Sequence, residues 1–169
     1  MAVQTAINPD VKKLGELIRD SKVAMLTTAA PDGQLHSRPM ATQVPDSEEF
    51  DGTLWFFTRD DSPKVAEIQE DEHVNVSYAD SSSQNYVSVA GRATLVHDRG
   101  KIDELWSPIH KAWFPDGKDD PHLALLRVDA ESAEYWDSPS SKVVQLFGIV
   151  KALATGQEAD LGENRKINF

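Results

Sequence analysis

Short segments with the apolar patterning of β-strands recur along most of this chain, and they restrict its fold more than any other feature. Turn-forming residues separate them, so neighbouring strands are expected to form hairpins. Pro39 lies inside one segment, which fits only an edge or a bulged strand, and Gly91 marks a bulge or a close backbone approach in another. A small antiparallel barrel holds six or seven such strands without exposed edges, so the sequence predicts a mainly β fold. The segments are residues 22–29, 34–44, 53–58, 73–78, 85–96, 122–128 and 132–136.

Helical periodicity is confined to segments between and beyond the strands. Asn8 and Pro9 supply the cap and first residue of a helix over 8–20. Further helical patterns cover 63–69, an insert at 99–114 that Ser107-Pro108 divides in two, and 143–155, which a polar tail at 157–169 follows. A chain of 169 residues forms one domain by default, so residues 1–169 are expected to be a single domain with peripheral helices.

Composition excludes several classes of function. The chain has no cysteine, which rules out disulfides, thiolate metal sites and cysteine nucleophiles. A net charge of −11 repels nucleic acid, and no apolar run is long enough to span a bilayer, so a cytoplasmic protein with neither nucleic-acid nor membrane partners is expected. The five histidines lack metal-binding spacing, so no metal site is predicted; they are interpreted as solvated or core residues.

The segment TLWFFTRDDSPK combines a buried strand, a polar turn and a helix start. Ser62 is placed to cap the helix and Pro63 to begin it. The hydroxyls of Thr58 and Ser62, the Lys64 ammonium and the positive end of the helix together favour a phosphate site. Arg38, on an adjacent predicted strand, offers a second cation. Ordinary helix capping and solvated surface cations would give the same pattern, so this segment alone leaves both readings open.

Four stretches resemble those of the pyridoxamine 5'-phosphate oxidase-related FMN-binding split barrels, and are most similar to their general stress protein branch. They are SKVAMLTTAAPDGQLHSRPM, LWFFTRDDSPKVAEI, YVSVAGRATLV and AEYWD, in the family's order and spread over residues 21–137. The resemblance implies a six-stranded antiparallel split β-barrel of the FMN-binding type. It also implies a homodimer with an FMN at each side of the dimer interface.

The resemblance also assigns residues to the flavin. Arg38 and Lys64 would contact its phosphate, Thr58 and Ser62 would add donors, and Met40 and Phe57 would line its ring. Trp136 stands where the family's Glu-Phe-Trp motif sends an aromatic side chain to the flavin of the other subunit. Of the other tryptophans, Trp55 is expected in the core, and Trp106 and Trp113 in helix packing. The resulting list of cofactor-binding residues is Arg38, Met40, Phe57, Thr58, Ser62, Lys64 and Trp136, with catalytic residues unassigned.

The chain departs from the oxidase at several positions. Gln43 and Pro63 replace two cations near the phosphate, and Tyr86 replaces a glutamine at the ring, so FAD could compete with FMN. Lys142, Val144 and Leu146 stand where the oxidase holds its substrate and flavin with arginine and histidine, so oxidation of pyridoxamine 5'-phosphate is not expected.

Two classes of function therefore remain. One is a flavin-dependent oxidoreductase with an unknown small substrate, and the other is a non-catalytic flavin buffer or sensor in the stress response. A barrel of this kind that binds haem or a deazaflavin is a further alternative.

Overall fold

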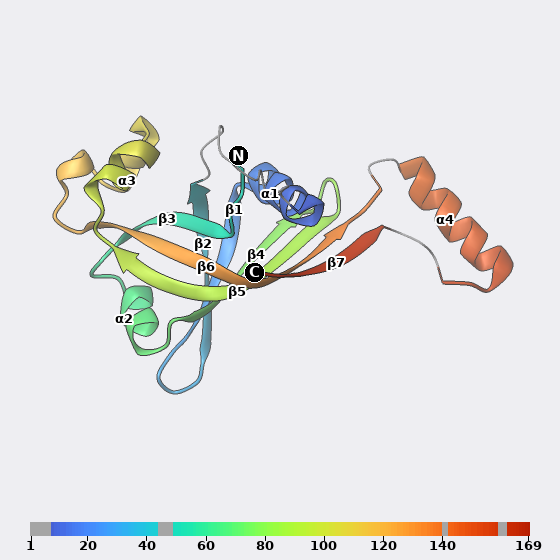
Figure 1. Ribbon diagram of the computed structural model, residues 1–169, viewed down its shortest axis with the longest axis horizontal. Helices are drawn as coiled ribbons and strands as arrows, with labels where there is room; N and C mark the ends of the chain where they lie inside the picture. The colour runs from blue at the N-terminus through green and yellow to red at the C-terminus, as the bar shows by residue number, and fades with distance from the viewer. Residues whose placement is uncertain (1–7, 44–48, 140–141, 159–161) are drawn as a thin grey trace, which may run out of the picture.

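A closed barrel of six antiparallel strands forms the centre of the computed structural model, which describes residues 8–43, 49–139, 142–158 and 162–169 (Figure 1). One hydrogen-bonded sheet runs in the order β3-β2-β1-β4-β5-β6-β7, and the pairing of β3 with β6 closes its first six strands. This confirms the predicted mainly β split barrel with peripheral helices. The strands are β1 (Val23–Ala29), β2 (Leu35–Gln43), β3 (Thr53–Arg59), β4 (His73–Asp80), β5 (Asn85–Val96), β6 (Leu123–Asp137) and β7 (Glu163–Asn168).

Strand β6 joins the barrel to the sheet beyond it. Its first half pairs with β3 and its second half with β7, while β5 pairs along almost its whole length. The sequence had suggested two separate strands here, but the structure has one continuous strand with a bulge opposite Ala90 and Gly91. A Cβ on Gly91 would lie 2.3 Å from the carbonyl oxygen of Asp129, so glycine permits the close backbone approach.

Strand β2 has an open edge along most of its length. It pairs with β1 from Leu35 to Ala41, but with β3 only through Thr42 and Gln43. Pro39 lies opposite Met25 in the part that pairs with β1 alone, where its missing N–H leaves no ladder bond unmade. Pro39 was predicted to lie in an edge or a bulged strand, and the structure shows the open edge.

Two groups of buried apolar side chains hold the fold together. The larger fills the barrel and includes Leu14, Leu17 and Ile18 of α1 (Pro9–Ser21), which packs against it. The smaller lies outside the barrel wall, between β3, β6 and the insert formed by α3 (Arg99–Leu105) and the short 3-10 helices η1 (Pro108–Ala112) and η2 (Gly117–Asp119). Trp55 and Phe57 of β3 pack on this smaller group, while Leu54 and Phe56 face the larger one, as strand alternation requires.

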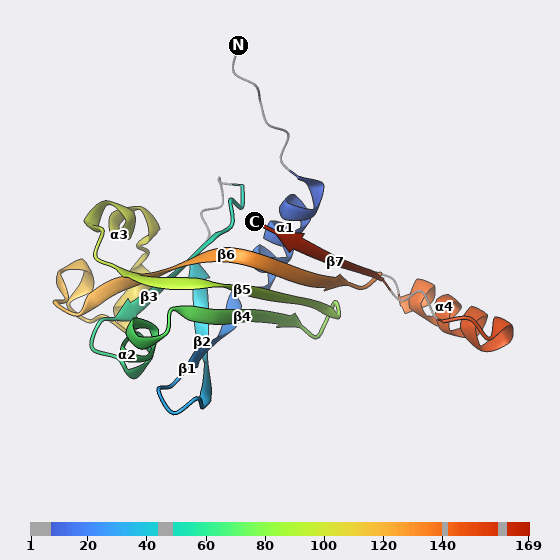
Figure 2. The same cartoon turned by 60° about the horizontal axis from the view of Figure 1, so that its bottom comes forward.

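The C-terminal region differs from the predicted polar tail. Helix α4 (Lys142–Thr155) lies where a helix was expected over 143–155, but Glu163–Asn168 form β7, which pairs with β6. Both views show α4 projecting away from the barrel (Figures 1 and 2). Only Ile167 of β7 is buried, because β7 is an edge strand with its other residues in solvent, and this single apolar position gave no strand pattern. No helix in the described part of the chain is long and apolar enough to cross a membrane.

Candidate functional site

The junction between β3 and α2 (Pro63–Glu70) is the framework of the candidate site. Thr58 is 3% exposed near the end of the strand, and the chain then turns through Asp60 and Asp61. The Asp60 N–H donates to the carbonyl oxygen of His122 at 2.9 Å, which ties this turn to the start of β6. Pro63 takes the first helical position, where its fixed φ suits the helix and no N–H is required. The turn therefore has a defined backbone.

Ser62 occupies the predicted cap position but does not cap with its side chain. Its backbone is extended, with φ −83° and ψ 150°, and its hydroxyl makes no hydrogen bond to the helix N–H groups. Instead, Nζ of Lys64 donates to Ser62 Oγ at 3.1 Å. The expected capping role of this hydroxyl is thus wrong, and Ser62 and Lys64 form a unit that presents a hydroxyl and an ammonium at the start of α2.

Lys64 is a partly buried cation. Burial lowers the pKa of its ammonium, and the positive charge of Arg38 lowers it further, against a smaller opposing effect of Asp61. Both main causes penalise the charged form. A bound anion would offset both, so Lys64 has the electrostatic character expected of a residue in an anion site.

Hydrogen bonds to neighbouring side chains hold the Arg38 guanidinium in place. Its Nη1 donates to Thr28 Oγ1 at 2.6 Å and its Nη2 to Glu67 Oε2 at 3.1 Å. Thr28 also donates to Glu67, and His36 Nδ1 lies 2.6 Å from the other Glu67 oxygen. These contacts lower the pKa of Glu67, with the Thr28 hydrogen bond as the largest cause. Arg38 therefore lies near Lys64, but with part of its hydrogen-bonding capacity and charge already used by Glu67.

A pocket of about 340 Å³ opens beside Lys64. It brings together Met40, Phe57, Thr58 and Lys64 from the predicted cofactor-binding set, although Phe57 and Thr58 point to opposite faces of β3. Apolar and aromatic walls with a few polar groups are typical of small-molecule sites. Its other lining residues are Pro39, Ala41, Gln43, Arg59, His110, Trp113 and Phe114.

His110 and Trp113, which the sequence did not indicate as site residues, lie at the η1 wall of this pocket. The His110 ring lies 4.4 Å from that of Phe57, between centroids, and burial lowers its pKa. Its Nδ1 accepts from the Ser107 N–H at 2.9 Å, so the neutral ring carries its proton on Nε2. Trp113 had been expected in helix packing, but its side chain is 65% exposed. A local pattern could not reveal that η1 folds back against β2 and β3.

A second pocket of about 310 Å³ adjoins the first and shares Ala41, Gln43, His110 and Trp113 with it. Arg19 and Lys22, at the end of α1, also line this second pocket. The two pockets therefore adjoin along β2, with Arg59 and Lys64 lining one and Arg19 and Lys22 lining the other.

Trp136 does not lie in either pocket. It pairs with Tyr86 on β5, twelve residues along β6 from Ala124, which pairs with Thr58. At about 3.3 Å per strand residue, this separation is roughly 40 Å along the strand. The indole is 38% exposed at the opposite end of β6. The predicted site residues thus divide into a cluster around Lys64 and one distant tryptophan.

Comparisons with known proteins agree with this architecture. Residues 9–160 match the family model described as pyridoxamine 5'-phosphate oxidase like. General stress protein 26 of Bacillus subtilis is 30% identical over 142 residues, covering 81% of this chain and 96% of that protein. Protein bli-3 of Neurospora crassa is 29% identical over 174 residues, covering 98% of this chain and 82% of that one.

Solved structures show the same likeness. The general stress FMN/FAD binding protein of Xanthomonas citri has a TM-score of 0.69 at 31% identity, covering 79% of this chain and 93% of that one. A candidate general stress protein 26 from Jannaschia sp. CCS1 has a TM-score of 0.74 at 25% identity, covering 95% of this chain and 99% of that one.

Proposed function

This chain belongs to the pyridoxamine 5'-phosphate oxidase-like family, and from that premise we propose that it is a flavin-binding general stress protein. The observation that carries the proposal is the partly buried Lys64 ammonium beside a largely apolar pocket at the start of α2. A flavin mononucleotide needs an anchor for its phosphate, a flat apolar slot and a few donors for its ring. The residues of this pocket offer all three.

In this proposal, each part of the pocket has a distinct task. Lys64, Thr58 and Ser62 hold the phosphate, with the partial positive charge of the α2 N-terminus behind them. Arg38, close to Lys64, adds positive charge, and its hydrogen bond to Glu67 fixes the orientation of its guanidinium. Met40 and Phe57 line the ring and keep water from it. His110 presents a ring N–H at the same wall, and the flavin itself, when bound, supplies the redox chemistry.

The phosphate assignment is tested with Lys64→Ala. Loss of one charge-assisted contact costs about 1.5 to 3 kcal/mol, so FMN affinity should fall roughly ten- to a hundredfold. Riboflavin, which lacks the phosphate, should bind both proteins nearly equally. Fluorescence titration measures both ligands, and Lys118→Ala is a matched control because Lys118 pairs with Asp103 outside the pocket. Equal weakening for the two ligands, or unchanged FMN binding, would refute the assignment.

FMN is the proposed cofactor, and FAD is the alternative that the second pocket favours. That pocket continues from the first towards Arg19 and Lys22, which suits the extra phosphate and nucleoside of FAD. Parallel titrations with FMN and FAD distinguish the two. The Xanthomonas citri relative is described as binding FMN or FAD, which supports a flavin without choosing between them.

We further propose a cytoplasmic homodimer. A Trp136 that reaches a flavin must reach the flavin of a second copy, since its own pocket lies at the other end of β6. Large apolar side chains exposed at η1 and on α4 supply surface for such an interface, among them Ile109, Trp113, Phe147 and Leu153. A chain without cysteine also has no need of an oxidising compartment.

The visible spectrum of the purified protein distinguishes a flavin-dependent oxidoreductase from a non-catalytic flavin protein and from a haem or deazaflavin protein. Flavin bands that NADH or NADPH bleaches support an oxidoreductase, whereas stable flavin bands support a buffer or sensor. A Soret band instead would identify a haem protein, and a blue-shifted flavin-like spectrum a deazaflavin protein.

Pyridoxamine 5'-phosphate should not be a substrate. Leu146 is 63% exposed on α4 and cannot donate a hydrogen bond to a phosphate or hydroxyl. Flavin-loaded protein under air should therefore form no pyridoxal 5'-phosphate at an enzymatic rate. Turnover of about one per second or faster would contradict this prediction.

A further inference from the structure

A cluster of potential metal ligands lies where three neighbouring strands end. Asp60 directly follows β3, His97 directly follows β5, and His122 directly precedes β6. Because β3 and β5 both pair with β6, these residues meet although 62 positions separate Asp60 from His122. The cluster therefore combines residues from separate segments of the chain, and it is not a single stretch of consecutive acidic residues. Histidine spacing in the sequence therefore gave no indication of it.

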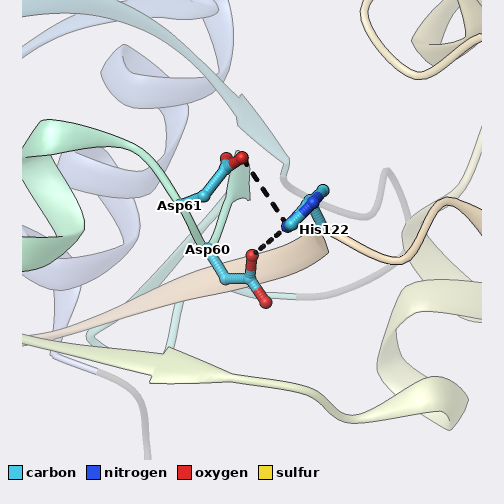
Figure 3. A group of neighbouring side chains, drawn as sticks. All are labelled: Asp60, Asp61 and His122. Atoms are coloured by element: carbon cyan, nitrogen blue, oxygen red, sulfur yellow. Dashed lines mark hydrogen bonds and ion pairs between the residues drawn. The ribbon is translucent and has the colours of Figure 1, made fainter.

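The donor atoms are close together (Figure 3). His122 Nδ1 lies 2.9 Å from Asp60 Oδ1 and 3.6 Å from Asp61 Oδ2, and the three donors all lie within 4.8 Å of one another. Ligands bound at about 2.0 to 2.2 Å around one transition-metal ion stand roughly 3 to 3.5 Å apart. The donors are thus already near the spacing of a shared coordination sphere.

The surroundings hold these donors in place. The Asp60 N–H bonds to the carbonyl oxygen of His122, and Arg59 pairs with Leu123 in the sheet, so both backbones are fixed relative to each other. His97 Nε2 lies 3.1 Å from the second oxygen of Asp60 and orients that carboxylate. Hydrogen bonds of this kind to ligating groups are usual around protein metal sites.

The charge balance also favours a cation. Two carboxylates, Asp60 and Asp61, meet at the cluster, and a third, Asp120, lies beside it with its side chain 6% exposed. Two cations lie near them: Arg59 binds Asp61 at 3.0 Å and lies 3.7 Å from Asp120, and Lys64 is close enough for the charge of Asp61 to raise its pKa. Asp60 is contacted by the imidazoles of His97 and His122, which offset its negative charge only when they are protonated.

We propose that Asp60, Asp61 and His122 bind one divalent transition-metal ion of the zinc class, with His97 as a positioning residue. One imidazole and two carboxylates form a mixed nitrogen and oxygen ligand set, which suits such ions better than Mg²⁺ or Ca²⁺. The side chains of Asp61 and His122 are 47% and 45% exposed, so water fills the remaining coordination positions and the ion enters directly from solvent. Ion entry displaces the Arg59 contact at one Asp61 oxygen. The metal site shares the turn between β3 and α2 with the candidate flavin pocket, which Arg59 also lines, but none of its three ligands lines that pocket.

The experiment is a calorimetric titration of the full chain with Zn²⁺, alongside Mg²⁺. One saturable Zn²⁺ per chain is expected, with little Mg²⁺ binding, and Asp60→Asn and His122→Gln should each weaken Zn²⁺ at least about tenfold. His73→Gln is the matched control, since His73 forms a similar exposed pair with Asp71 but, within the described part of the chain, belongs to no group of three such donors. No saturable binding, or equal binding by all variants, would overturn the proposal.

A second measurement uses the unaltered protein, so it remains decisive if a variant fails to fold. On addition of Zn²⁺, the imidazole resonances of His122 should shift most and those of His97 less, while those of His36 and His73 stay in place. Shifts at His36 or His73 without a shift at His122 would overturn the assignment.

Discussion

At the scale of single residues, Glu67 does more than the sequence suggests. It accepts hydrogen bonds from Thr28 and Arg38 and contacts His36, and its side chain is only 12% exposed. Glu67→Gln keeps the shape but removes the charge that holds Arg38. We expect a loss of about 1 to 3 kcal/mol in the free energy of unfolding, measured by urea denaturation.

Glu70→Gln on the same helix is the control, and as an exposed change it should stay within about 0.5 kcal/mol. The pKa of Glu67 is lowered in the folded state from its ordinary value of 4.5, so its contribution is fully present above pH 4.5 and is lost as the pH falls from there through the folded-state pKa. A Glu67→Gln effect of unchanged size in acid would show that charge is not the cause.

The sequence predicted part of the candidate site, residue by residue. Phe57, Thr58 and Lys64 were predicted and do share one pocket, because a strand, a turn and a helix start adjacent in sequence fix the local geometry. Met40, on β2, lines the same pocket, and only the family resemblance had indicated it. Arg38 was expected to serve a phosphate, and the sequence held no sign that Glu67 would engage it first. Partners 29 positions apart become neighbours only when α2 docks on the barrel.

At the scale of elements, the turn between β4 and β5 depends on one carboxylate. Asp80 accepts from the hydroxyls of Ser82 and Ser83 and from their N–H groups, which lowers its pKa to about 2. A carboxylate with a lowered folded-state pKa stabilises the fold above its unfolded pKa of 3.8, and this contribution disappears as the pH falls towards 2.

Asp80→Asn should therefore be destabilising at neutral pH, by an amount that stays constant down to about pH 4 and shrinks below it. Urea denaturation of both proteins across this range measures the difference. Ser82→Ala removes one donor and should give a smaller change of the same sign. A difference that is constant down to pH 2 would contradict the role of the Asp80 charge.

Sequence periodicity predicted the positions of most strands and helices. The errors at β6 and β7 have physical causes. The charged residues Asp129 and Glu131 interrupt the apolar pattern of β6, so one strand looked like two, whereas the bulge absorbs the interruption. Strand β7 escaped prediction because an edge strand needs few apolar residues. Strand pairing partners, which close the barrel, are long-range choices that local patterns do not encode.

At the scale of the whole molecule, the proposed dimer makes a specific prediction about Trp136. Sedimentation should show two chains per particle. Trp136→Ala should weaken flavin binding by about tenfold while leaving the dimer intact, because in the proposed dimer the half-exposed indole, near the end of β6, would pack on the flavin ring of the other chain. Leu35→Ala is a control for an exposed apolar side chain, 72% exposed at the start of β2.

Mixing the two site variants gives a stricter test. If each site takes Lys64 from one chain and Trp136 from the other, a heterodimer of Lys64→Ala and Trp136→Ala chains regains one intact site. Subunit exchange should then restore full-affinity binding in a fraction of the sites. A monomer with full affinity, or a stable exchange without recovery, would rule out the composite site.

The route of the chain through α4 also bears on how this protein could be rebuilt. The chain leaves the sheet after Asp137 and returns at Glu163, which are direct partners in the β6 and β7 pairing. The end of β6 and the start of β7 are therefore neighbours in the sheet, and the segment that contains α4 connects these two antiparallel strands. A longer helix, a tight turn or a grafted domain at this point would leave the barrel register unchanged.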